Sequence, residues 1–362
     1  MKKRYLFFIC LSSLLGYFVL RSPNHLKDLN FIHKAILENH PGVYNTQDPD
    51  FNKHLQKAYF QAKNDLIRAN GDIEKKRVLS IFSKSFNDVH LSINWSNSLK
   101  KKQTRVVKNF NLSYLSHEII WVTVPTFDFL PGKEVDKSFN QLARTLFKVK
   151  QPKHIIFDIR GNCGGNSAYG NKIVDSFFGK AYADQQRYLY EKNVSVDWKA
   201  SQGNVNHLAL LVSRYPQYPS FKIIQAGLQK SLDQKKPYYR EDPEGLKTSE
   251  KNLVSQVPNT KVIVLIDSLN VSAALDFIDD LKSMTKNITL VGQTTKADRL
   301  YMEIRSLPLP SGQGVFNFPI KVYRNRPRLD NQPYKPSIQY DDINNTSAIQ
   351  ESLIKKIKQR QI

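Results

Sequence analysis

Hydrophobic side chains recur at helical spacing through the N-terminal part of the chain. Between residues 25 and 40, the sequence HLKDLNFIHKAILENH places leucine and isoleucine every three or four positions, as on one face of a helix. That helix should end at Pro41-Gly42, because proline cannot continue the backbone hydrogen bonds of a helix. Similar patterns over residues 51–68 and 73–86 predict further helices. We therefore expect a helical N-terminal part over residues 22–92.

Farther along the chain, short hydrophobic runs alternate with helical patterns. The runs are rich in β-branched and aromatic residues, predict strands, and read HLSINW, HEIIWVTVP, KHIIFDI, KVIVLID and NITLVG. NKIVDSFFG and SAALDFIDDLK predict helices, and LPLPSGQGVFNFPIKVY predicts a hairpin. Such alternation is typical of an α/β core. We assign the core to residues 93–350, with a variable insertion at about 180–258 and a basic C-terminal tail at 351–362.

The first 21 residues differ from the rest of the chain. A basic start is followed by sixteen residues without a charge, from Tyr5 to Leu20. This pattern is typical of a signal peptide or a short N-terminal membrane anchor. No Ala-x-Ala cleavage site follows, so both alternatives stay open. In either case we expect an exported protein that is periplasmic, secreted or held to the membrane by this segment.

Charge and cysteine content narrow the function classes. The formal net charge is +22, and the basic residues are spread along the whole chain without an aromatic and basic nucleic-acid motif. We expect no nucleic-acid partner, and contact with an anionic membrane surface instead. Cys163 is the only cysteine outside the leader, which excludes an intramolecular disulfide there. No Cys/His pattern for a metal is present, so we expect neither a metal nor a cofactor.

The segment HIIFDIRGNCGGNSAYG combines a predicted core strand with a glycine-rich loop. The pair Gly164-Gly165 leaves backbone N–H groups uncovered by side chains, so that a ligand can approach them closely. An ordinary tight turn is the alternative interpretation. Cys163 in this loop is a further candidate nucleophile, which would require surroundings that favour its thiolate.

Ser272 follows the predicted strand at residues 261–267 and opens a predicted helix. A serine in this position is usually only a helix N-cap. However, the free N–H groups and the dipole of a helix N-terminus favour negative charge. Ser272 is therefore also well placed to be a nucleophile whose attack creates an oxyanion.

Four motifs in this order resemble the tail-specific, or C-terminal-processing, and tricorn-type serine peptidase family. They are HIIFDIRGNCGG, VIVLIDSLNVSAALDFIDDLK, ITLVGQTT and LPSGQ. The resemblance spans about residues 26–340. It implies a crotonase-like (ClpP/crotonase) spiral core, peptide or protein substrates, and an acyl-enzyme formed on Ser272. It also implies an oxyanion hole lined by Gly164, Gly165 and Ala273, and it makes Cys163 a variable loop position.

The resemblance leaves two possible bases for Ser272. Lysine-type members carry the base shortly after the Val-Gly-x-x-Thr strand, where this chain has Asp298, and Lys296 is offset by two positions. Tricorn-like members use a histidine from the N-terminal part, and His90 in Asp-Val-His fits that position, with Leu91 replacing the usual Thr or Ser. We favour His90, because an imidazole titrates near neutral pH. Lys296 is the alternative base.

A third residue should orient the imidazole. The resemblance assigns this role to Asp330, where tricorn-like members have a glutamate, although Pro333 and Ser337 depart from the family pattern. A turn-initiating Asp-Asn is the alternative. Only 26 residues separate His90 from the strand that begins at His117, too few for the PDZ domain of the processing enzymes. A rival hypothesis is a non-catalytic relative that binds a peptide or an apolar ligand.

Overall fold

The computed structural model describes residues 24–96, 109–241 and 253–362. The chain divides into two compact units, each assembled from three stretches of sequence. Of the described residues, the N-terminal unit comprises 24–96, 196–241 and 301–322, and the core unit comprises 109–195, 253–300 and 323–362. The predicted leader, residues 1–21, lies outside the described residues. No helix in the described ranges is long and apolar enough to span a membrane.

Helices open the N-terminal unit, as their hydrophobic spacing predicts. They are α2 (His25–Asn39), the 3-10 helix η1 (Pro41–Tyr44), α3 (Phe51–Arg68) and α4 (Gly71–Lys84). Asn24 caps α2 by accepting a hydrogen bond from the Lys27 N–H, and α2 ends two residues before Pro41. The hydrophobic faces of these helices pack in one core cluster, which includes Leu29, Ile36 and Leu55, none of which is exposed.

A five-stranded sheet completes this unit. Its strand order is β1 (Ser92–Trp95), β10 (Gly314–Arg324), β5 (Ser195–Lys199) and β6 (Tyr238–Glu241), with β9 (Tyr301–Pro308) also paired to β10. The helices α8 (Gln202–Arg214) and α9 (Ser220–Asp233) connect β5 to β6. This unit thus takes in much of the segment predicted as an insertion, because Leu208 and Leu228 are buried in its core. Only α7 (Lys180–Glu191) and residues 192–195 and 253–258 of the described part belong to the core unit.

The core unit is built on a second sheet. Its order is β11 (Ile338–Gln339), β8 (Ile288–Gly292), β7 (Lys261–Ile266), β4 (His154–Asp158), β3 (Ile119–Thr123) and β2 (Asn111–Ser116). All neighbours are parallel except β2 and β3. Asp158 at the end of β4 is in register with Leu265 near the end of β7. The two loops that follow these strands therefore leave the sheet at the same edge.

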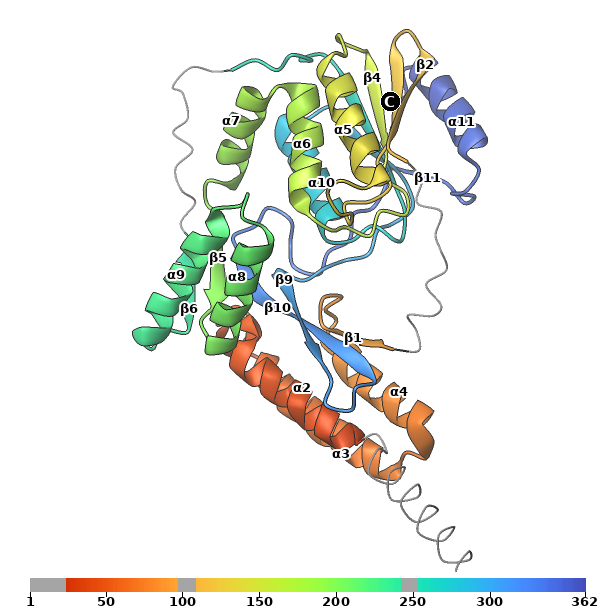
Figure 1. The fold of residues 1–362 in the computed structure, drawn as a ribbon. Coiled ribbons are helices and arrows are strands. Elements are labelled where there is room, and N and C mark those ends of the chain that lie inside the picture. Colours follow the sequence, from red (N-terminus) through yellow and green to blue (C-terminus); the bar gives the residue numbers. More distant parts are fainter. Residues whose placement is uncertain (1–23, 97–108, 242–252) are drawn as a thin grey trace, which may run out of the picture. The chain divides into compact units, whose positions relative to one another are not determined.

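Helices cover both faces of this sheet (Figure 1). On one face, Ile155 and Phe157 pack against α5 (Glu134–Phe147), α6 (Ser167–Phe178) and α10 (Ala273–Met284). On the other face, Ile156 packs against α11 (Thr346–Lys358). Burial on both faces explains why the central strands are apolar throughout rather than alternating. Most of the segment predicted as a tail is in α11, because the chain buries Ile349 and Leu353 on the sheet.

Candidate active site

Ser272 lies in a strained turn between β7 and α10. Its backbone angles are φ 58° and ψ −127°, a combination that costs a non-glycine residue about 1–3 kcal/mol. Ser272 stands at the N-cap position, yet its side chain makes no cap hydrogen bond to the described part of α10. An ordinary N-cap serine has extended backbone angles and does make this bond. The N-cap interpretation therefore does not explain Ser272.

The glycine pair contacts this turn directly. A Cβ atom added to Gly164 would lie 2.7 Å from Val271 O, 3.0 Å from Ala273 N and 3.0 Å from Ser272 Cβ. Its φ of +89° is also a conformation that favours glycine. Only glycine therefore allows the loop to approach the nucleophile turn so closely. The ordinary tight-turn interpretation does not require this contact.

Backbone N–H groups beside Ser272 differ in their availability. The Gly164 N–H donates to Asn162 Oδ1 at 2.9 Å, and the Ser272 N–H donates to Asp298 Oδ2 at 3.1 Å. The N–H groups of Gly165 and Ala273 donate no hydrogen bond to any of the described residues. Of the three residues predicted to line an oxyanion hole, Gly165 and Ala273 thus have donors to offer, and Gly164 supplies the close approach.

Two buried asparagines join the glycine loop to the nucleophile turn. Asn270 Nδ2 donates to Ile159 O at 2.6 Å and to Asn162 O at 3.1 Å. Asn162 Nδ2 in turn donates to Val124 O at 3.1 Å. Neither asparagine is exposed. Each of these bonds has a backbone carbonyl as its acceptor. The two asparagines therefore fix the distance between the backbones of the two loops.

The Asp-Ile-Arg sequence at the end of β4 forms a structural ion pair. Arg160 Nε and Nη2 donate to the two carboxylate oxygens of Asp158 at 2.7 and 2.6 Å. Arg160 also donates to Ile343 O and, at 3.0 Å, to Thr346 Oγ1. This motif therefore anchors the segment that leads into α11.

The motif resemblance places Asp298 where lysine-type members carry their base. It is 1% exposed, and besides accepting from Ser272 it pairs with Arg328. Lys296, the alternative base, has an exposed side chain, and its backbone N–H donates to Asn270 O at 3.1 Å. The buried group that contacts the nucleophile turn from this loop is thus a carboxylate.

Arg328 contacts three carboxylates of the core unit. Its other partners are Asp279 at 2.9 Å and Asp276 at 3.0 Å, both on α10. Burial acts to raise the pKa of Asp276, but the charges of Arg326 and Arg328 outweigh it and hold that pKa below its ordinary value. Burial and the neighbouring charge of Asp279 raise the pKa of the Tyr334 phenol, which donates to Asp279. No motif or local pattern in the sequence indicates this cluster.

Asp330 contacts two residues of the core unit, Arg299 and Leu300. Its Oδ1 accepts from the Leu300 N–H at 2.8 Å, and its Oδ2 pairs with Arg299 Nε at 2.8 Å. The side chain is 40% exposed. These contacts fix the loop between β8 and β9, and the role of Asp330 toward His90 stays a prediction.

His90 lies in the N-terminal unit, in a turn after α4. It is 4% exposed, its backbone N–H donates to Asp88 Oδ1 at 2.9 Å, and its ring Nδ1 lies 3.3 Å from the same oxygen. Asp88 is buried as well. The sequence motif contained Asp88 without assigning it a role, and this contact makes it a second candidate for orienting the imidazole. Because His90 and Ser272 belong to different units, their convergence stays a prediction.

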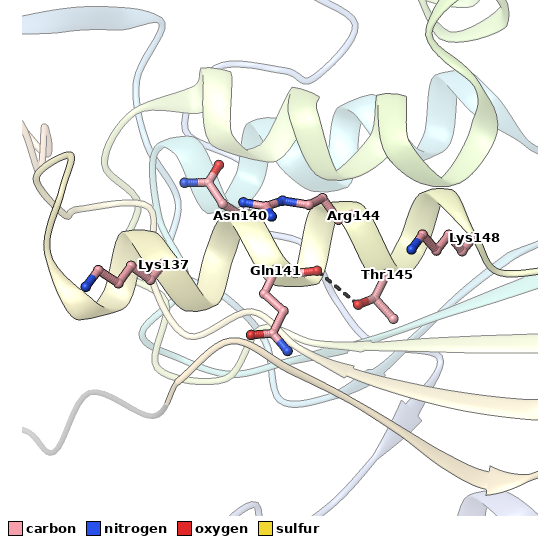
Figure 2. A pocket seen from close by; sticks show the side chains of 6 residues that line it. All are labelled: Lys137, Asn140, Gln141, Arg144, Thr145 and Lys148. Carbon is pink, nitrogen blue, oxygen red and sulfur yellow. Dashed lines mark hydrogen bonds between the residues drawn. The ribbon is translucent and has the colours of Figure 1, made fainter.

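A hollow lies beside α5 in the core unit (Figure 2). It is lined by Lys137, Asn140, Gln141, Arg144, Thr145 and Lys148. Five of these residues belong to α5 and Lys148 is its C-cap, and the Thr145 hydroxyl donates to Gln141 O at 3.0 Å. Ser272 and its neighbours are not among them, so this hollow is no part of the candidate active site. Contact of such basic side chains with an anionic membrane surface stays a prediction.

Comparison with known proteins identifies the family. The model of peptidase family S41 matches residues 118–335, more than half of the chain. The chain belongs to peptidase family S41. The resemblance drawn from its motifs is thereby confirmed, since family S41 is a family of serine peptidases. No curated protein matches the chain by sequence.

Solved structures support the fold. The structure of mature CPAF has a TM-score of 0.59 and 12% identity to this S41 member, covering 93% of this chain and 97% of CPAF. Its complex with lactacystin gives a TM-score of 0.56 at 12% identity, with 93% and 98% covered. A lipoprotein from Streptococcus agalactiae gives 0.51 at 13% identity, with 92% and 98% covered. The S41 member thus has the predicted α/β fold, with a ClpP/crotonase-like core and N-terminal helices.

Proposed function

We propose that this S41 member is an exported serine peptidase that hydrolyses peptide bonds through an acyl-enzyme on Ser272. One observation supports this proposal above the others. Ser272 is held in a strained conformation beside the Gly164-Gly165 loop, and its side chain is not used as a helix cap. Strain of this kind is expected where a residue has a task besides stabilising the fold.

In the proposed reaction, the Ser272 hydroxyl attacks the carbonyl carbon of the scissile peptide while His90 takes the hydroxyl proton. The tetrahedral oxyanion accepts hydrogen bonds from the N–H groups of Gly165 and Ala273. Loss of one such donor typically costs about 3–4 kcal/mol of transition-state stabilisation. His90 then returns the proton to the leaving amine, and a water molecule hydrolyses the acyl-enzyme by the same steps.

The orienting carboxylate has two candidates. The resemblance to tricorn-type peptidases implies Asp330, and the contact of 3.3 Å to ring Nδ1 favours Asp88. A carboxylate beside one ring nitrogen fixes the tautomer that leaves the other nitrogen free to accept a proton. We keep Asp330 in the proposal, with Asp88 as its alternative.

Export is proposed from the sequence of residues 1–21, a signal peptide or membrane anchor. The Streptococcus agalactiae protein of similar fold is a lipoprotein by its description, which is in keeping with an exported protein. The substrates would then be peptides or proteins outside the cytoplasm.

Labelling with a fluorophosphonate probe across pH 5 to 10 tests the nucleophile and the base together. We expect Ser272 to carry the adduct, identified by mass spectrometry of the peptide that contains it. The labelling rate should rise with pH through a limb near neutrality, because deprotonated imidazole is the active form. His90→Ala should lose this limb and label at least about 10²-fold more slowly, whereas Lys296→Ala should label at the wild-type rate.

Other outcomes of this experiment distinguish the rivals. If Lys296→Ala abolishes labelling and the limb lies well above neutral pH, the Ser272-Lys296 dyad is correct. If the folded wild-type protein is not labelled at any pH, the chain is a non-catalytic binder of a peptide or an apolar ligand.

Peptide hydrolysis is expected to persist in EDTA. The proposed steps use a hydroxyl, an imidazole and backbone N–H groups, none of which requires a metal ion. Among the described residues, no group of three or more His, Cys, Asp or Glu side chains could hold a metal. The rate should be measured with EDTA in excess over protein and after adding back zinc. Loss of activity on chelation that zinc restores would contradict the serine mechanism.

A further inference from the structure

The loop between β8 and β9 places a buried carboxylate against the backbone of the nucleophile. Asp298 Oδ2 accepts the Ser272 N–H at 3.1 Å. We propose that Asp298 is a positioning residue, which orients the peptide group before Ser272 and so holds the nucleophile in its strained conformation. This inference rests on the proposed role of Ser272 as nucleophile and extends it to a residue outside the predicted site.

The peptide group between Val271 and Ser272 is restrained at both ends. Its N–H is bound by Asp298. Its carbonyl oxygen accepts from the Ala274 N–H at 3.2 Å and lies where only a glycine at position 164 leaves room. A rotation of this peptide group would change the φ angle of Ser272 and move the carbonyl into the glycine loop. The Asp298 bond therefore fixes both the direction of the Ser272 side chain and its distance from the loop.

Asp298 is itself held in place. It is 1% exposed, and its backbone carbonyl accepts from the Asn331 N–H at 3.0 Å. Its second carboxylate oxygen pairs with Arg328, which also contacts Asp276 and Asp279 on α10. The ion pairs thus connect the carboxylate to the first two turns of the helix that Ser272 precedes. Each guanidinium nitrogen of Arg328 contacts a different aspartate, and the planar group holds these three donors in a fixed arrangement.

The same contacts explain why an aspartate suits this position in a chain with a histidine base. Arg328 presents a positive charge to the Asp298 carboxylate, and the Ser272 N–H donates a hydrogen bond to it. A lysine there would bring a second cation against Arg328, and it would leave the Ser272 N–H without this acceptor. The position is therefore built for an anion that binds backbone, not for a base that contacts the serine hydroxyl.

The Ser272 amide provides a direct test through hydrogen exchange. In protein labelled with ¹⁵N-serine, the Ser272 N–H should exchange at least roughly tenfold faster in Asp298→Ala than in the wild type. In Asp298→Asn the side-chain oxygen can still accept, so that exchange should lie closer to the wild type. This readout requires no enzymatic activity.

The catalytic consequence is measured with the fluorophosphonate probe and a peptide substrate. In Asp298→Ala we expect kcat and the labelling rate to fall by about 10²-fold, because the hydroxyl is displaced from its attacking geometry. KM should stay within about twofold, because the residue does not touch the substrate. Asp298→Asn should recover most of the labelling rate.

Asp280→Ala serves as the matched control. Asp280 is a buried carboxylate of α10 with its own arginine partner, Arg187, at 2.8 Å, and it has no bond to Ser272. Its removal should lower thermal stability to a similar extent while leaving exchange at Ser272 and labelling unchanged. All variants are compared at a temperature at which circular dichroism shows them folded.

The outcomes separate this inference from the proposed function. Wild-type exchange and labelling in Asp298→Ala would overturn the positioning role while leaving Ser272 as nucleophile. Equal losses in Asp298→Ala and Asp280→Ala would also overturn it, since the effect would then be general destabilisation. Absence of labelling in the wild type would instead overturn the proposed function, and exchange at Ser272 would still decide whether Asp298 holds this amide.

Discussion

Replacing Ser272 with alanine is expected to lower kcat for peptide hydrolysis at least about 10⁴-fold. The acyl-enzyme cannot form without the hydroxyl, and only the backbone donors of Gly165 and Ala273 would still stabilise attack by water. KM should change little. The measurement is hydrolysis of a quenched fluorescent peptide, with the fluorophosphonate probe as a second readout.

The same substitution should leave the fold intact. The Ser272 side chain makes no cap bond to α10, and alanine has the same backbone preferences at φ 58° as serine. We therefore expect a thermal midpoint within about 2 °C of the wild type. Ser283→Ala is the matched control, because Ser283 lies on the same helix and its hydroxyl donates to Asp280 O at 2.7 Å. Hydrolysis by Ser272→Ala at more than a tenth of the wild-type rate would contradict the proposed nucleophile.

The elements that could be predicted from sequence are those with a strong local pattern. Helices α2, α3 and α4 carry regular apolar spacing, and β4 and β7 are continuous apolar runs buried on both faces. The edge strand β2 was missed, because only half of its sequence NLSYLS is hydrophobic and none of its residues is buried. The strands β5 and β6 were missed for a different reason. They pair with each other across about 40 intervening residues, and no local pattern encodes such pairing.

In the candidate site, the residues that could be predicted are those in the loops that directly follow strands. Gly164 follows β4 and Ser272 follows β7, so that two neighbouring parallel strands bring them together. The role of Asp298 was not predictable in this way. It depends on an ion pair with Arg328, 30 residues farther along the chain, and on a bond to a backbone N–H. Sequence alone does not show which buried carboxylate meets which arginine.

Gly165→Ala is expected to have the second large effect, on both stability and activity. A Cβ atom at this position would lie 2.1 Å from Phe127 O and 2.4 Å from Asp128 N, which are backbone atoms that cannot rotate away. Its φ of +132° is also unfavourable for alanine. The bridge between Phe127 and Gly165 must then open. We expect a loss of about 2–4 kcal/mol in the free energy of unfolding.

Activity should fall further than stability explains, because opening this bridge moves the Gly165 N–H away from the oxyanion. Loss of one such donor lowers kcat by about 10²–10³-fold.

The variant Gly161→Ala separates the effect on stability from the effect on activity. Gly161 has a φ of +78° in the same loop, but a Cβ there meets no atom within 4 Å. It should cost about 1–2 kcal/mol through the backbone alone and keep kcat near the wild-type value. Urea unfolding and peptide hydrolysis of both variants provide the comparison. Equal kcat values for the two folded variants would show that Gly165 contributes no donor, and the oxyanion would then have to be stabilised elsewhere.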